Sequence, residues 1–343
     1  MNILIIRLSA IGDVAMTVPV IDSVARKYPQ VNFTVLSRPF LRPLFSKMPG
    51  NVVFEVADPE NEYKGIVGIW KLFLRLRKRK IDAVADLHDV LRSKMLRGLF
   101  FLTGTKTIHI DKGRQEKKSI TRKHNKQIHP LKSTFIRYSE VFSRLGFPAD
   151  INFVSVFGKG NKGDFENIKP VTGEKNMTWI GIAPFAKHQG KIYPLEKTEE
   201  IVSYLAFREN CRLFFFGGGN EEQKILSEWE IKYPRSFSII GKITGFEQEL
   251  TLMSHLDVMV SMDSANMHLA SLVGTPVISV WGATHPYAGF YGWNQLPENI
   301  VQSDLYCRPC SIYGNIPCYR NDYACLVKLP VKAIIDVIEK YLK

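Results

Sequence analysis

The chain has 343 residues, which is too long for one compact hydrophobic core and suits two domains of roughly 150–170 residues. Hydrophobic residues make up 45% and charged residues 23% of it, a balance typical of a soluble globular protein, and no apolar stretch reaches the roughly 18–20 residues that span a bilayer. The net charge of +13 indicates an anionic partner such as nucleic acid, acidic lipid or a phosphorylated substrate, or else a basic surface without a specific partner.

The first half of the chain alternates between predicted strands and predicted helices. Near-continuous apolar runs predict buried parallel strands at 2–7, 31–36, 52–56 and 83–87. Helical spacing of apolar residues predicts helices at 14–27, 66–80, 91–99 and 131–145. The opening apolar run is too short for a signal peptide, and Asp13 follows it without a small-residue cleavage site, so we expect a cytoplasmic protein.

A polar, glycine-rich stretch at 158–163 predicts an inter-domain linker. Beyond it the alternation restarts, with strands expected at 179–183, 212–216, 256–261 and 277–281 and helices at 196–208, 221–232 and 331–342. Two such halves predict an α/β fold of two Rossmann-like doubly wound domains facing across a cleft, at 1–165 and 166–343. The last helix could pack back on the first domain.

The first candidate site follows the opening strand. Arg7 leads through Ser9 and Gly12 to Asp13, where a glycine turn enters a helix whose first amides can hold a polar ligand. The stretch has neither a Gly-Lys-Ser/Thr ending nor a G-x-G-x-x-G pattern. A carboxylate at this position could act as a general base toward a substrate hydroxyl, or it could cap the helix.

The second candidate site follows the strand at 256–261. Asp263 and Ser264 are typical helix-start residues, so the backbone amides of Ser264, Ala265 and the next residue would lack partners in the helix. Together with the helix dipole, these amides predict a diphosphate site that needs no metal. His268 lies on the first turns of the same helix, and we interpret it as a packed histidine rather than a catalytic one.

Three further loops could complete such a site. Gly282 and Thr284 lie in a turn after the next strand and could close over the same phosphates. Lys191, and Lys187 from the same loop, could neutralise the charge that develops on a departing diphosphate, although each could equally be a solvated loop lysine. Glu221, or alternatively Glu222, follows a glycine turn and could bind ribose hydroxyls or simply sit at a helix start.

Taken in order, these segments resemble glycosyltransferase family 9, the bacterial ADP-heptose heptosyltransferases. The resemblance runs over nearly the whole chain. It rests on an ordered set of motifs at 7–19, at 82–88 with Arg92 and Ser93, at 191–194, at 263–265 with 268–270, and at 274–276.

The resemblance implies a GT-B fold with an N-terminal acceptor-binding domain and a C-terminal nucleotide-sugar-binding domain. It implies inverting transfer of heptose from ADP-heptose to a lipopolysaccharide inner core, with no covalent intermediate and no required cofactor. Asp13 and Lys191 would be catalytic. Donor binding would involve Lys187, Glu221, Asp263, Ser264, Ala265, His268, Gly282 and Thr284. Acceptor binding would involve Ser9, Gly12, Arg92, Arg114, Lys117, Lys118 and Arg122.

Two departures from the family pattern, at 188–190 and in the three glycines at 217–219, touch the expected donor pocket. A GT-B enzyme that uses another nucleotide sugar for a different surface glycan is therefore the alternative. The absence of any Asp-x-Asp pair disfavours a metal-held diphosphate.

The acceptor implied by the resemblance is an anionic, lipid-linked saccharide of the Kdo–lipid A type. The basic runs at 75–80 and 112–132 fit such a partner, and they predict peripheral contact with the cytoplasmic face of the inner membrane. Solvated helix or loop surfaces would give the same runs. A polyanion- or nucleic-acid-binding protein is a distant alternative, because no recognition motif accompanies the basic residues, and a nicotinamide oxidoreductase lacks its G-x-G-x-x-G turn.

Five cysteines argue against a disulfide framework, since the number is odd and no secretion signal is present. Four of them have a spacing that could bind a structural zinc ion, with reduced buried thiols as the other interpretation: Cys307, Cys310, Cys318 and Cys325.

Overall fold

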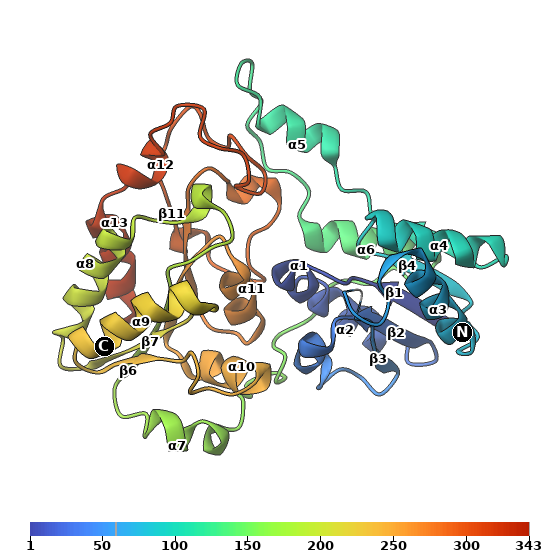
Figure 1. Cartoon of the computed structure of the whole chain (residues 1–343), viewed down its shortest axis with the longest axis horizontal. Coiled ribbons are helices and arrows are strands. Elements are labelled where there is room, and N and C mark those ends of the chain that lie inside the picture. The colour runs from blue at the N-terminus through green and yellow to red at the C-terminus, as the bar shows by residue number, and fades with distance from the viewer. Residues whose placement is uncertain (59, 343) are drawn as a thin grey trace. The chain divides into compact units, whose positions relative to one another are not determined.

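The computed structural model describes residues 1–58 and 60–342, and over them the chain divides into two compact units (Figure 1). The N-terminal unit comprises Met1–Gly113 and Lys132–Gly158, and the C-terminal unit comprises Arg114–Leu131 and Lys159–Lys343. Each unit is built on one parallel sheet with flanking helices. The predicted α/β class with two Rossmann-like domains is therefore confirmed.

The N-terminal sheet has five parallel strands in the order β3-β2-β1-β4-β5. Four of them were predicted, namely β1 (Asn2–Ile6), β2 (Asn32–Ser37), β3 (Val52–Val56) and β4 (Ala83–Asp86). The edge strand β5 (Lys106–His109) was missed, because its four residues are at most half-buried and carry no apolar run.

The helices of the N-terminal unit are α1 (Ile11–Ala15), α2 (Val18–Lys27), α3 (Gly65–Arg77), α4 (Leu91–Leu102) and α6 (Thr134–Leu145). The single helix expected at 14–27 is wrong, because the chain breaks between α1 and α2. Pro19 lacks an amide, so it cannot continue the bonding of α1 and instead lies in the first turn of α2.

The C-terminal sheet has six parallel strands in the order β11-β10-β9-β6-β7-β8. They are β6 (Thr178–Ala183), β7 (Cys211–Phe215), β8 (Ser236–Ser238), β9 (Val258–Met262), β10 (Val277–Trp281) and β11 (Ile300–Gln302). In both sheets the strand order reverses beside the first strand, between β1 and β4 and between β6 and β9. Ligands of doubly wound sheets bind at the carboxyl ends of strands at such switch points.

The C-terminal unit holds α5 (Arg114–Ile120), α7 (Lys169–Thr172), α8 (Leu195–Ala206), α9 (Asn220–Lys232), α10 (Phe246–His255), α11 (Ala265–Leu272), α12 (Ala324–Val327) and α13 (Val331–Ile338). The final α-helix, α13, packs on α8 and β10 and buries Ile334 and Ile338 in the core of this unit. Its apolar face is thus used in the core of the C-terminal unit, and packing of this helix on the first domain, which the sequence left as a possibility, stays a prediction. No helix in the described part of the chain is long and apolar enough to cross a membrane.

The unit boundaries differ from the single break expected between 165 and 166. Residues 114–131 leave the N-terminal unit and pack on the C-terminal unit, where Ile120 and Leu131 form a buried cluster with Ala288. The backbone amide of Leu131 donates to the carbonyl of Tyr287 at 2.8 Å. The chain enters the C-terminal unit for the last time after Gly158. In the polar stretch beyond it, the amide of Gly163 already donates a hydrogen bond to Ser254 of the C-terminal unit.

Candidate active site

An arginine and an aspartate form an ion pair at the carboxyl end of β1. Arg7 Nη2 lies 2.7 Å from Asp13 Oδ2, and Arg7 Nη1 donates at 2.7 Å to the carbonyl of Leu87, which follows β4. Asp13 Oδ2 also accepts the amide of Ala10 at 3.3 Å, so the carboxylate caps α1 as one interpretation predicted. The Asp13 side chain is nevertheless 32% exposed, which leaves it accessible to a substrate.

A buried carboxylate organises the neighbouring turn after β4. Asp86 is fully buried, and its Oδ1 accepts the backbone amides of His88 at 2.9 Å and Asp89 at 2.8 Å. Its Oδ2 accepts a bond from Arg97 Nη1 at 3.0 Å. With both oxygens engaged, Asp86 shapes the turn that presents His88 to the end of β1.

His88 links the two strand ends through both of its ring nitrogens. Its Nδ1 accepts the amide of Leu8 at 3.4 Å, and its Nε2 lies 3.5 Å from the hydroxyl of Ser9. Burial, reinforced by the positive charges of Arg7 and Lys112, lowers the pKa of His88 to about 3. The imidazole is therefore neutral at physiological pH, and because Nδ1 is an acceptor, Nε2 carries the proton toward Ser9.

The guanidinium of Arg7 stays positively charged at physiological pH. Burial opposes the charge of Arg7, but its electrostatic interactions with Tyr138, Asp13 and Asp86 and its hydrogen bond to Asp13 outweigh burial and raise the pKa of the guanidinium. An opposite charge at 2.7 Å favours the ionised form of the Asp13 carboxylate. The arrangement thus provides an accessible, oriented carboxylate that can accept a proton from a bound hydroxyl.

The switch point of the C-terminal unit holds a second ion pair. Lys191, in the loop after β6, places Nζ 2.8 Å from Oδ2 of Asp263, which directly follows β9. The two side chains are 16% and 5% exposed, so this pair is more enclosed than the first. The ammonium carries three N–H donors, and the aspartate can use only some of them. Two residues identified in separate motifs are brought together here.

Helix α11 begins beside this pair. Ser264 is the N-cap residue, with extended backbone, and its hydroxyl lies 3.2 Å from that of Ser261 rather than capping the helix. The first amides of a helix, here from Ala265 onward, have no acceptor inside it. His268 is buried on this helix, in line with the packed histidine expected from the sequence.

A buried arginine that the sequence did not single out fixes the turn after β10. Arg308 Nε donates to the carbonyl of Gly282 at 2.5 Å, and its Nη2 donates to the carbonyl of Thr284 at 2.9 Å. The amide of Ala283 in turn donates to the carbonyl of Gly190 at 2.8 Å. A side chain on Gly282 would place its Cβ only 2.5 Å from that same oxygen. The turn is therefore hydrogen-bonded to, and closely packed against, the loop that carries Lys191. This contact joins residues distant in the chain and could not be predicted from the sequence.

A comparison with models of protein families identifies the family of this chain. A model described as glycosyltransferase family 9 (heptosyltransferase) matches residues 69–317, which is more than half of the chain. The chain belongs to glycosyltransferase family 9. It is therefore a glycosyltransferase, as the resemblance predicted.

Several known proteins are similar to this chain over most of their length. The lipopolysaccharide core heptosyltransferase OpsX of Haemophilus influenzae is 24% identical over 296 residues, which are 83% of this chain and 80% of that protein. A family 9 glycosyltransferase from Veillonella parvula superposes with a TM-score of 0.75 at 16% identity, covering 99% of this chain and 96% of the other. Escherichia coli heptosyltransferase WaaC with ADP gives 0.66 at 18% identity and covers 99% and 100%.

The remaining residues expected to bind the donor lie at the surface of this family 9 chain. Lys187 is exposed in the loop before Lys191. Glu221 is exposed in the first turn of α9, whereas Glu222 Oε2 accepts the amide of Gly218 at 2.7 Å and so holds the glycine turn. Of the two glutamates, Glu221 is the better placed to bind a ligand.

The residues expected to bind the acceptor are divided between the two units. Ser9, Gly12 and Arg92 lie in the N-terminal unit, with Arg92 exposed in the first turn of α4. The four basic residues of the later run lie in the C-terminal unit: Arg114, Lys117, Lys118 and Arg122. Lys117 is buried, with its ammonium 4.3 Å from the ring centre of Phe290, so it anchors the segment. The other three are exposed.

The late cysteines do not form a ligand cage. All are free thiols, and within residues 1–58 and 60–342 no three His, Cys, Asp or Glu side chains converge as metal ligands. Burial raises the pKa of Cys325 to about 11 and also raises the pKa of Cys310, so these thiols are protonated at neutral pH. The tetrahedral zinc set considered from the spacing is not formed in this arrangement.

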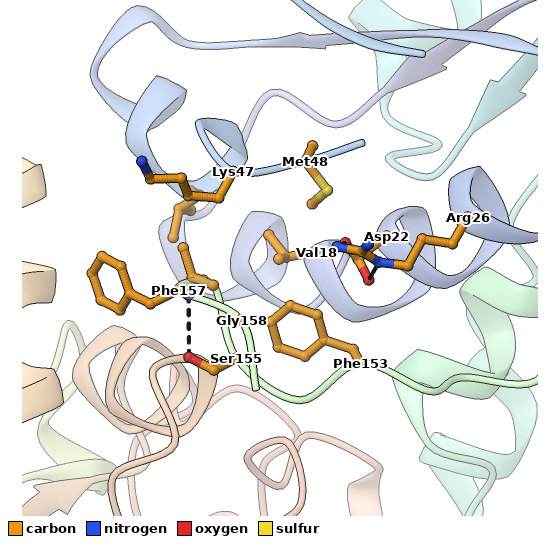
Figure 2. A pocket seen from close by; sticks show the side chains of 11 residues that line it. Val18, Asp22, Arg26, Lys47, Met48, Phe153, Ser155, Phe157 and Gly158 are labelled. Carbon is orange, nitrogen blue, oxygen red and sulfur yellow. Dashed lines mark hydrogen bonds and ion pairs between the residues drawn. The ribbon is translucent and has the colours of Figure 1, made fainter. Parts of the chain in front are cut away.

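The N-terminal unit also has a small pocket away from these groups. It has a volume of about 80 Å³ and lies between α2 and the segment 153–158 (Figure 2). Asp22 and Arg26 on its wall form an ion pair at 2.8 Å, which neutralises the charges there. None of the residues expected to bind substrate lines this pocket.

Proposed function

We propose that this family 9 chain transfers heptose from ADP-heptose to a lipopolysaccharide inner-core acceptor, with inversion at the anomeric carbon. The observation that carries the chemistry is the accessible Asp13 carboxylate, held by Arg7 at 2.7 Å at the first switch point. The donor and the acceptor class are supported by the names of similar proteins, a lipopolysaccharide core heptosyltransferase and a heptosyltransferase with ADP.

In this mechanism Asp13 takes the proton from the attacking hydroxyl of the acceptor. The hydroxyl oxygen forms a bond to the anomeric carbon while the bond from that carbon to the diphosphate oxygen breaks, and ADP leaves with the electron pair. Lys191 and the first amides of α11 stabilise the negative charge that develops on the diphosphate. Asp263 holds the ammonium of Lys191 in position at 2.8 Å.

The other parts of the site have supporting roles in this proposal. His88, as a neutral imidazole, orients Ser9 toward the acceptor, and Arg92 is an exposed cation in the first turn of the helix after β4. Lys187, Glu221 and the turn at 282–284 complete the donor site, where Glu221 binds the ribose. The acceptor is an anionic lipid-linked saccharide of the Kdo–lipid A type, reached at the cytoplasmic face of the inner membrane.

The test begins with calorimetric and thermal-shift titrations of ADP, UDP, GDP and CMP. We expect ADP to bind most tightly, and we expect ADP-heptose with a deacylated Kdo–lipid A acceptor to release ADP and give a product of inverted anomeric configuration by NMR. Preference for another nucleotide would keep the fold but assign a different donor, an alternative favoured by the residues at 188–190 and 217–219. Failure to bind any nucleotide would overturn the proposal.

A further inference from the structure

Helix α3 is apolar on both of its faces. Ile69, Leu72, Phe73 and Leu76 are buried in the core of the N-terminal unit. On the opposite side, large apolar side chains remain exposed to solvent: Ile66 at 73%, Val67 at 68%, Trp70 at 49% and Leu74 at 43%. A surface helix of a soluble domain normally places polar residues there, so this face requires an occupant.

The exposed residues form one continuous stripe. At about 100° per residue, the four apolar side chains and three exposed cations fall within an arc of about 140°, which the buried residues do not enter. The cations are Lys71, Arg77 and Lys78. Apolar side chains thus run from one edge of the arc across its middle, Lys71 and Lys78 lie along the opposite edge, and Arg77 and Lys78 are at the C-terminal end. We call these seven residues the α3 stripe.

The charged residues of the α3 segment itself have a single sign. Between Tyr63 and Ile81 the sequence contains seven Lys or Arg residues and no Asp or Glu. Two of them, Arg75 and Arg79, share the one carboxylate of Glu55 from β3, which offsets one of their two charges. The α3 stripe therefore presents apolar and aromatic groups beside cations with no acid of its own segment nearby. The neighbouring helix α4, which packs against α3 (Figure 1), ends in the exposed residues Phe101 and Leu102.

We propose that the α3 stripe lies in the headgroup region of an anionic lipid leaflet. Charge complementarity selects this occupant: acidic lipids attract the cations, while the aromatic and aliphatic groups enter the boundary with the acyl chains. A second copy of the chain is disfavoured, because a symmetric interface would bring two acid-free basic stripes together. The proposal deepens the proposed function, on which it rests for the lipid-linked acceptor, and it assigns the membrane contact to α3 rather than to the run at 112–132.

The test is co-sedimentation of the full chain with vesicles of phosphatidylcholine alone or enriched in phosphatidylglycerol. We expect binding only to the anionic vesicles. The variant Ile66→Ser/Trp70→Ser/Leu74→Ser should bind them about tenfold more weakly or less, and Lys71→Gln/Arg77→Gln/Lys78→Gln should lose binding at moderate salt. The apolar variant should turn over a deacylated, water-soluble acceptor at the wild-type rate.

Matched controls separate the α3 stripe from general hydrophobicity and charge. Phe207→Ser/Ile231→Ser removes exposed apolar groups of the C-terminal unit, and Lys159→Gln/Lys224→Gln/Lys340→Gln removes the same charge as the α3 cation variant. Both controls should bind vesicles like the wild type, as should Arg114→Gln/Lys118→Gln/Arg122→Gln.

Three results would overturn the proposal. They are wild-type binding by the α3 variants, loss of binding only in the variant of residues 114–122, and a change of oligomeric state of the α3 variants in light scattering, which would identify a second copy as the occupant. Vesicle binding through α3 without any glycosyl transfer would instead count against the proposed function alone.

Discussion

The two switch points of this enzyme carry the same kind of ion pair in different surroundings. In the N-terminal unit Asp13 pairs with Arg7 at 2.7 Å and its side chain is 32% exposed. In the C-terminal unit Asp263 pairs with Lys191 at 2.8 Å and its side chain is 5% exposed. The accessible carboxylate can exchange a proton with a substrate, whereas the buried one can only hold its lysine. In the proposed mechanism the first pair therefore serves proton transfer, and the second pair positions a cation.

The largest effect is expected from removing the accessible carboxylate. In Asp13→Asn the proton acceptor is lost while the side chain keeps its shape, so we expect kcat to fall by roughly 10²–10⁴-fold, the usual contribution of a general base. Steady-state release of ADP from ADP-heptose measures it. The exposed Asp150→Asn in the same unit is the control and should be as active as the wild type. Turnover by Asp13→Asn at the wild-type rate would remove Asp13 from the mechanism.

The enclosed pair should act as one unit in donor binding. We expect Lys191→Met and Asp263→Asn each to weaken ADP binding by about tenfold, and the double variant to bind no more weakly than Lys191→Met, because Asp263 acts through the lysine. Calorimetric titration of the four proteins gives the coupling. Lys224→Gln, on an exposed face of α9, is the control. Strictly additive losses would show that the two side chains contact the donor independently.

A smaller effect, on folding stability, is expected from replacing Arg308, which holds the turn after β10. Arg308→Met leaves the carbonyls of Gly282 and Thr284 without their donor in a buried setting, which costs about 2–5 kcal/mol of unfolding free energy. Urea unfolding measures it, with Arg320→Met as a control because Arg320 pairs with the surface residue Asp322. Equal stability of both variants would show that the turn does not depend on Arg308.

The smallest effect is expected in how the free energy of unfolding depends on pH, to which one histidine in each unit contributes. Burial lowers the pKa of His88 to about 3 in the N-terminal unit and that of His285 to about 4 in the C-terminal unit, from 6.5. Since the unfolded chain binds these protons first, stability is complete above about pH 6.5 and declines as the pH falls toward the folded pKa values. Calorimetry near pH 7 and pH 5 should show a smaller decline for His88→Gln than for the wild type. An unchanged decline would mean that the pKa of His88 is the same in the folded and the unfolded protein.

The sequence predicted the elements that carry strong local signals. The apolar runs located the central strands, and Asp13, Lys191 and Asp263 were identified because each follows such a strand. The contacts that the sequence could not predict join residues that are distant in the chain. The pairing of Lys191 with Asp263 joins two strand ends, the clamp of Arg308 acts on a turn 24–26 residues away, and the packing of Lys117 on Phe290 takes residues 114–131 into the second unit.

The division of labour between the two ion pairs is tested most directly by measuring ADP affinity and turnover side by side in Asp13→Asn and Lys191→Met. The account predicts that Asp13→Asn binds ADP like the wild type but turns over roughly 10²–10⁴-fold more slowly, whereas Lys191→Met loses both ADP affinity and turnover. Loss of ADP affinity in Asp13→Asn, or full turnover in either variant, would contradict it.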